Sequence, residues 1–209
     1  MPAPHIPTVR EVLSDLARDN SRPNWERLRP RYEADLKAPA LDLLDALAAR
    51  LSAQGFGPVT TKLFRPYRDV RFSKDKTPYH THLHMLWSLG EGPNAPGLFY
   101  GISPDYVSLG CGAMAFDKEG LTRWRAAVDS DAGALSRLLD GLLGSGHRLG
   151  DAHLKRVPAP YPQDHPRADL LRRKGFAVWA DLDETTDETA LWAAAEELLP
   201  VARWIGAHV

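Results

Sequence analysis

The sequence predicts an α+β fold in which a mostly antiparallel sheet, in the middle of the chain, packs against N- and C-terminal helices. Apolar residues recur at helical spacing in roughly the first 55 residues and again after residue 116. Between them, short runs rich in β-branched and aromatic residues are separated by clusters of Pro, Gly, Asn and Asp, as in strands joined by turns. This segregation does not support a parallel βαβ fold. The 209 residues suffice for one core, so we expect one globular domain over residues 1–209.

Three helical segments are expected before the strands. The first begins with a capping-box pattern at Thr8 and should end near Asn20. The second, in RPNWERLRPRYEADL, contains Pro30, which removes a backbone donor and should break or kink the helix. The third begins at Pro39 and should end at Gly55, because glycine readily adopts the left-handed conformation that ends a helix.

Strands and further helices are expected in the rest of the chain. Four runs should form strands: VTTKLF, HLHMLWSL, GLFYGI and YVSLGCGAMAF. Helical spacing returns in DKEGLTRWRAAV and DAGALSRLLDGLL. A short helix should begin at Pro166, with Asp164 available to cap it, and end at Gly175. A last strand, FAVWADL, precedes a closing helix that Pro200 should break or kink.

The charges exclude a protein that is basic as a whole, yet they are unevenly distributed. The formal net charge is -1 and the pI is near 6.7, so attraction to nucleic acid or membrane would need a local patch. Residues 62–84 carry six Lys or Arg against two Asp, and residues 155–174 carry the same numbers, a net +4 in each. Residues 181–209 have seven acids and one Arg, which offset one of these patches.

Cys111 is the only cysteine, which excludes an intramolecular disulfide and a multi-cysteine metal site. It lies in an apolar run, where we expect a buried and unreactive thiol. The N-terminal residues lack the basic and apolar regions of a secretory leader, and no apolar run approaches the roughly 18 residues that span a bilayer. We therefore expect a cytoplasmic protein with no membrane partner.

The stretch FRPYRDVRFSKDKTPYHTHLH, residues 64–84, is the strongest candidate site. If residues 67–72 form a strand, a turn closed by Pro78 follows and concentrates hydroxyl and ammonium donors that suit phosphate or carboxylate. The expected ligand-binding residues here are Arg68, Arg71, Ser73, Lys74, Lys76 and Tyr79. The glycines of a Walker loop are missing, which argues against a triphosphate site. Alternatively, Asp69 and Asp75 pair with the neighbouring cations and the turn binds nothing from outside.

Three alternating histidines follow, His80, His82 and His84. On a strand all three would project from one face, at a spacing that can chelate a transition metal. The same alternation fits the half-exposed side of a strand, and we expect no metal and no cofactor. The sequence leaves open whether the protein is an enzyme. If it is, Asp69 or His82 is the expected proton-transfer group.

The second basic segment, residues 155–174, could complete the same site. Its candidates for ligand binding are Lys155, Arg156 and Arg173, and His165 could act as an acid or base because its ordinary pKa lies near neutrality. These predictions need the two segments to fold toward one cleft. The simpler interpretation is that the cations at the end of the short helix stabilise the helix dipole.

Several motifs together resemble the mainly bacterial family called domain of unknown function 2461, over residues 20–205. They are NWERLRPRYE, FRPYRDVRFSKDKTPYHTHL, GISPDYVSLGCGAMAF, and LKRVP with DHPRADLLRRKGF, and RFSKDKTPY is the most specific. The resemblance implies a single-domain protein and brings no activity with it. The family pattern usually has Lys at His80 and no His at His84, which weakens the metal hypothesis, and it continues as helix through Pro30. The matching positions are Arg68, Asp69, Arg71, Phe72, Ser73, Lys74, Asp75, Lys76, Thr77, Pro78, Tyr79, His82, Lys155, Arg156, Asp164, His165 and Pro166.

The function that the sequence favours is the binding of a phosphorylated or carboxylated small molecule in an electropositive cleft. One alternative is a nucleic-acid-binding accessory protein, with Phe64, Tyr67, Phe72 and Tyr79 stacking on bases between the cations. Another is a structural or interaction protein whose charged turn is self-paired. The reaction, the substrate and the oligomeric state are left open.

Overall fold

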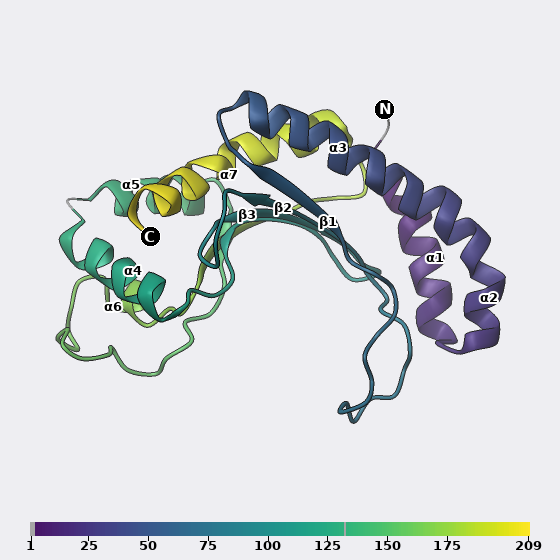
Figure 1. Ribbon diagram of the computed structural model, residues 1–209, viewed down its shortest axis with the longest axis horizontal. Coiled ribbons are helices and arrows are strands. Elements are labelled where there is room, and N and C mark those ends of the chain that lie inside the picture. Colours follow the sequence, from purple (N-terminus) through teal and green to yellow (C-terminus); the bar gives the residue numbers. More distant parts are fainter. Residues whose placement is uncertain (1–2, 132) are drawn as a thin grey trace.

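The computed structural model describes residues 3–131 and 133–209, and its strands form one six-stranded sheet (Figure 1). The order across the sheet is β1-β2-β3-β4-β6-β5, with every neighbouring pair antiparallel. This confirms the predicted α+β fold with an antiparallel sheet between N- and C-terminal helices. The strands are β1 (Val59–Leu63), β2 (Leu83–Leu89), β3 (Gly97–Ile102), β4 (Val107–Ala113), β5 (Arg148–Leu149) and β6 (Phe176–Asp181).

The helices lie along one face of the sheet and at its two ends. They are α1 (Ile6–Arg18), α2 (Arg22–Arg31), the π-helical η1 (Tyr32–Lys37), α3 (Ala38–Ala53), α4 (Lys118–Ser130), α5 (Ala134–Gly144), α6 (Ala168–Leu171) and α7 (Glu188–His208). Figure 1 shows α3 and α7 across the convex face of the curved sheet, α1 and α2 at one end, and α4 to α6 at the other. No described helix crosses the concave face, which we call the open face. In the described part of the chain, no helix is both long and apolar enough to cross a membrane.

Neither Pro30 nor Pro200 breaks its helix, so the predicted break is wrong at both positions and the kink stays a prediction. Pro30 is inside α2, and the helix continues through η1 into α3, which begins near Pro39. In η1 the turns widen, and the N–H of Ala38 donates to the carbonyl of Glu33. These wide turns precede Pro39, whereas Pro30 lies before them on an exposed side of α2, where water can satisfy the carbonyl that its missing N–H leaves without a donor. Pro200 lies on the exposed side of α7, where water can satisfy the carbonyl that it leaves without a donor.

The two faces of the sheet differ in burial, as the alternation along β2 shows. Leu83, Met85 and Trp87 are fully buried, whereas the residues between them are half-buried. The indole N–H of Trp87 donates to the carbonyl of Leu44 in α3 over 2.9 Å, so this side faces the helices. Cys111 is fully buried, and burial raises the pKa of its thiol to about 12, as expected for an inert side chain.

The segment before β6 has less helix than predicted. Helix α6 covers Ala168–Leu171 and does not begin at Pro166. Asp164 does not cap it, because the ring of His165 accepts the hydrogen bond from the backbone N–H of Arg167 (3.0 Å). Residues 150–167, which precede α6, form a long irregular loop at the end of the sheet away from α1 and α2 (Figure 1).

Candidate functional site

The loop of residues 64–82, between β1 and β2, is a narrow irregular hairpin that extends away from the sheet (Figure 1). Its two sides are joined by one isolated bridge between Tyr67 and Tyr79 and by a hydrogen bond from the N–H of Arg68 to the carbonyl of Pro78 (2.9 Å). The predicted strand over residues 67–72 is therefore wrong. Pro66 and Pro78 have no N–H to donate, so a regular ladder cannot form here.

The two acids of this loop are held by its own cations. The guanidinium of Arg71 binds both oxygens of Asp69, at 2.9 and 2.6 Å, which lowers the pKa of this carboxyl. Arg68 contacts Asp75 at 2.5 Å and the carbonyl of Thr77 at 3.0 Å. The backbone N–H of Thr77 and then Arg68 lower the pKa of Asp75 to about 2. Both acids are thus ionised counter-ions of the loop, an arrangement that does not favour proton transfer by Asp69.

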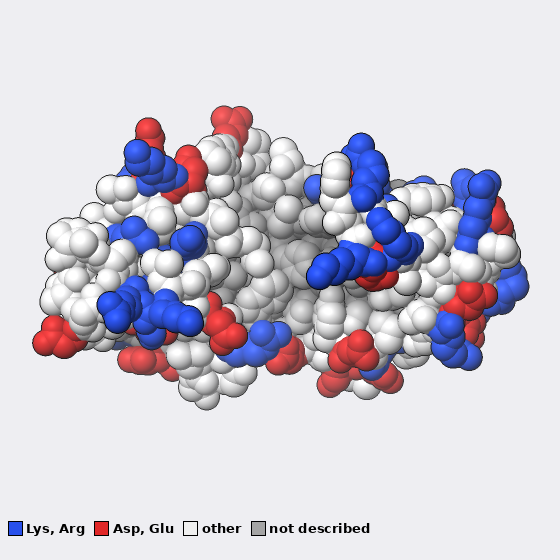
Figure 2. Space-filling model, turned by 90° about the horizontal axis from the view of Figure 1, so that it is seen from below, with Lys and Arg blue, Asp and Glu red and all other residues white. Residues whose placement is uncertain are grey.

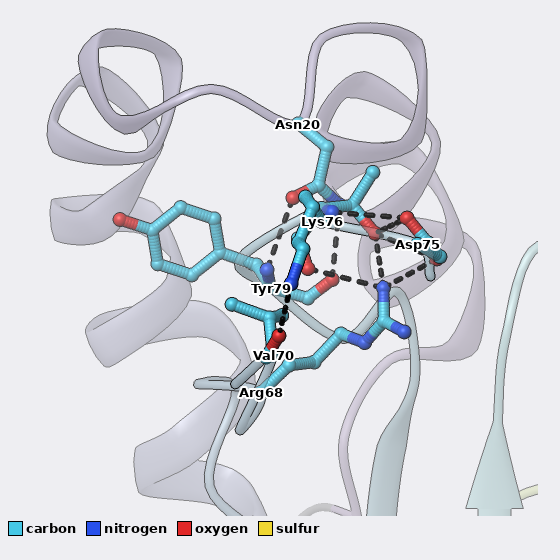
Figure 3. Close-up of polar contacts among 7 residues, drawn as sticks. Asn20, Arg68, Val70, Asp75, Lys76 and Tyr79 are labelled. Carbon is cyan, nitrogen blue, oxygen red and sulfur yellow. Dashed lines mark hydrogen bonds and ion pairs between the residues drawn. The ribbon is translucent and has the colours of Figure 1, made fainter. Parts of the chain in front are cut away.

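The base of the loop is fastened to the N-terminal helices (Figure 3). The side chain of Asn20 donates to the carbonyl of Tyr79 (2.9 Å) and accepts from its N–H (3.0 Å). The Tyr79 ring is only 6% exposed and stacks on Trp25 with centroids 4.8 Å apart, so it anchors the loop in the core. Lys76 donates to the carbonyl of Val70 (2.9 Å), across the same loop.

Beside the loop is a hollow of about 700 Å³, which we call the histidine hollow. Its lining residues are Lys62, Leu63, Phe64, Arg65, Tyr67, Asp69, His80, His82 and His84. Lys62 and Arg65 make no ion pair with any described residue, and the Lys62 ammonium lies 4.5 Å from the centroid of the Phe64 ring. A second hollow of about 400 Å³ shares His80 and His82 and is also lined by Arg68 and Tyr79.

The three histidine rings line the same hollow, with His84 stacked on His82 and His80 tilted against His82; we call them the histidine stack. The centroids of His80 and His82 are 4.6 Å apart, and those of His82 and His84 are 3.6 Å apart with an interplanar angle of 11°. Burial, followed by the neighbouring histidines, lowers the pKa of His82 to about 4 and that of His84 to about 3. His84 also shares a hydrogen bond of 2.6 Å with the Tyr106 hydroxyl. At neutral pH this stack is therefore uncharged. Among the described residues no group of three or more side chains has the arrangement of a metal site.

The second basic segment lies at the opposite end of the open face from the loop of residues 64–82, and not against it (Figure 1). Figure 2 shows Lys and Arg gathered on both sides of a hollowed middle region. Arg173 is buried and donates to Asp169 (2.7 Å) and the carbonyl of Gly150 (2.5 Å). The His165 ring is held between Asp129 (3.1 Å) and the N–H of Arg167. Both residues thus make structural contacts at this end of the molecule, Arg173 with Asp169 and Gly150 and His165 with Asp129.

The remaining candidates are less constrained. Lys155, Arg156 and Lys74 are exposed, and none makes an ion pair with another described residue. Ser73 is half-buried in the loop. The sequence prediction placed the ligand-binding cations at other positions of the loop and in residues 155–174, and it missed Lys62 and Arg65, which line the histidine hollow. Residues 62–84 have more cations than acids, which indicates that some of these cations stay unpaired. The structure shows which of them do.

The family described as "Conserved hypothetical protein (DUF2461)" matches residues 9–198. The chain belongs to the DUF2461 family. The match confirms the resemblance of the loop and strand motifs, and it includes most of α1, which lay outside the expected range of residues 20–205. No curated protein and no solved structure matches the chain.

Proposed function

We propose that this DUF2461 protein binds a small phosphorylated or carboxylated molecule in the histidine hollow. One observation carries the proposal: Lys62 and Arg65 line the hollow without an ion-pair partner among the described residues, while Arg71 occupies both oxygens of Asp69. Arg71 thus pairs with the acid at the rim, and Arg65, which makes no ion pair with Asp69, lowers the pKa of that acid more weakly through its charge. Lys62 and Arg65 both keep their hydrogen-bond donors for an anion from outside.

The side chains around these cations suit an anion. A guanidinium can hold a carboxylate or phosphate through two parallel hydrogen bonds, and a lysine adds a compact charge with three donors. Tyr67 accepts a hydrogen bond from the indole N–H of Trp25 (3.2 Å), so its own O–H is left to donate. The neutral His82 and His80 can each donate one hydrogen bond without placing a further charge in the hollow.

The proposal covers binding and includes no reaction. A general base works best when its pKa is near the working pH, whereas burial and the neighbouring ring lower the pKa of His82 to about 4. Asp69 is held by two hydrogen bonds from Arg71. The groups around the hollow therefore favour recognition of an anion over proton transfer.

Titration calorimetry at low ionic strength, with inorganic phosphate, citrate and a nucleoside monophosphate as ligands, tests the proposal. We expect at least one of them to bind, and Arg65→Gln and Lys62→Gln each to weaken binding about tenfold, because a charged hydrogen bond contributes about 1.5–3 kcal/mol. Arg29→Gln is the matched control, since Arg29 is an exposed arginine on α2 with no ion pair to a described residue. Absence of binding by the wild type, or equal binding by Arg65→Gln, would refute the proposal.

The self-paired loop favours a second candidate, an interaction protein. The pairs Arg68–Asp75 and Arg71–Asp69 brace a loop that carries Phe72, whose ring is 96% exposed. A braced loop that presents one apolar ring can dock into a partner with little loss of conformational entropy. On this alternative, Arg68→Gln should lower the melting temperature and Phe72→Ser should abolish partner capture, while phosphate binding stays unchanged.

A further inference from the structure

A row of aromatic rings crosses the open face of the sheet and ends in the histidine hollow. It runs from Trp179 on β6 to Phe99 on β3, with centroids 5.5 Å apart, and from Phe99 to His84 on β2, at 4.8 Å. His82 and His80 continue it at centroid distances of 3.6 and 4.6 Å. These rings come from segments far apart in the sequence, and only the strand order of the sheet brings them together.

The floor beneath the row consists of glycines. A Cβ atom at Gly110, the β4 partner of Trp179, would lie 2.5–2.9 Å from three atoms of the Trp179 ring. A Cβ atom at Gly101 would lie 3.0 Å from Phe99 and 3.1 Å from His84. The indole therefore lies over Gly110 with one face against the sheet, and Trp179 is half-buried, with the guanidinium of Arg148 over its ring at 5.9 Å from the centroid. Rings fixed in this way lose little further freedom when another ring stacks on them.

The charged side chains beside the row that have no ion-pair partner are positive. Lys62 and Arg65 lie at the histidine end and have no ion-pair partner among the described residues. At the other end Arg148 lies 5.9 Å from the centroid of Trp179, and Asp181 neutralises it over 2.9 Å. Figure 2 shows further Lys and Arg on both sides of this hollowed face. An anionic chain of aromatic units is complementary to such a surface.

We infer that the open face binds single-stranded nucleic acid, with a base stacked on Trp179 at one end of the ring row and phosphates held by Lys62 and Arg65 at the other end. The inference rests on the proposed function, because the same two cations hold the anion in both. From β6 to β2 the row crosses three inter-strand spacings of about 4.8 Å each, which is longer than one base. A strand therefore fits better than a free nucleotide. Antiparallel sheets with exposed aromatics bind unpaired bases in this way, whereas the bases of a duplex are stacked within it.

Fluorescence anisotropy with a labelled oligo(dT) of about ten nucleotides tests the inference. We expect Trp179→Leu to weaken binding about 5- to 150-fold, and Trp179→Phe, which keeps a ring, to retain most of it. Trp192→Leu is the matched control, because Trp192 lies on α7 beneath Arg50 and not on the open face. Circular dichroism of each variant checks that the fold is kept. The double variant Lys62→Gln with Arg65→Gln should reduce the slope of log K against log salt by about 0.7 per cation.

The outcomes separate the two proposals. If phosphate binds and Arg65→Gln weakens it, while oligo(dT) binds no tighter than thymidine monophosphate, the inference is overturned and the anion site stands. If Trp179→Leu binds oligo(dT) as the wild type does, and poly-glutamate competes equally well, the face recognises an acidic chain by charge alone, which also overturns it. Tight oligo(dT) binding that depends on Trp179 but not on Lys62 and Arg65 supports the ring row and overturns the shared phosphate site.

Discussion

Asn20 ties the long loop to the helices, and its replacement by alanine should destabilise the protein measurably. The side chain makes two hydrogen bonds to the backbone of Tyr79, at 2.9 and 3.0 Å, at a partly buried position. Each such bond contributes about 0.5–1.5 kcal/mol net, so Asn20→Ala should lower the free energy of unfolding by about 1–3 kcal/mol. In a chain of this size, 1 kcal/mol corresponds to a change of roughly 2–4 °C in melting temperature.

Urea denaturation followed by circular dichroism measures this loss, and Asn20→Asp sharpens the interpretation. An ionised carboxylate can still accept from the N–H of Tyr79 but repels its carbonyl, whereas a protonated carboxyl can donate to that carbonyl. The stability difference between Asn20→Asp and the wild type should therefore shrink between pH 7 and about pH 4. An Asn20→Ala variant within about 0.3 kcal/mol of the wild type would refute the view that this side chain fastens the loop.

Three further predictions concern the open face and the loop. The free energy of unfolding should fall by roughly 1–3 kcal/mol as the pH drops from about 6.5 to 4. The lowered pKa values of His82 and His84 keep these residues neutral in the folded protein, while the same histidines take up protons in the unfolded chain. In urea denaturation at a series of pH values, a variant with Gln at both positions should lose less stability over this range. Gly110→Val should cost about 1–3 kcal/mol because its side chain would displace the Trp179 ring, and Trp179→Leu should relieve part of this loss in a double-mutant cycle. Phe72→Ser should leave the melting temperature unchanged, since a ring that is 96% exposed loses no buried area; a decrease of several degrees would contradict the exposed position.

Local patterns in the sequence predicted which segments form helices and strands, because period and turn residues are local properties. The prolines show where such rules fail. Pro30 and Pro200 were expected to break or kink helices, yet both lie on exposed sides of continuous helices, where water can satisfy the carbonyls that are left without a donor. The identity of the proline does not encode which side of the helix faces water.

The candidate site was predicted in part. The neighbours of Asp69 and Asp75 could be listed as pairing partners, but only the loop geometry shows that Arg71 and Arg68 bind them. The ring row could not be predicted, because it needs β6 to pair with β4. Sequence periodicity does not report which strands become neighbours when a long segment lies between them.

The pairing of β4 with β6 also has a consequence for folding kinetics. Strands β1 to β4 form a meander whose longest connection is the loop of residues 64–82, whereas residues 114–175 separate β4 from β6. Closing a loop of that length costs entropy before any contact is gained, so contacts of high sequence separation form slowly. During synthesis β4 is an unpaired edge strand, with free N–H and C=O groups, until residues 176–181 emerge. We therefore expect the N-terminal meander to form first and the docking of β6 and α7 to limit the folding rate.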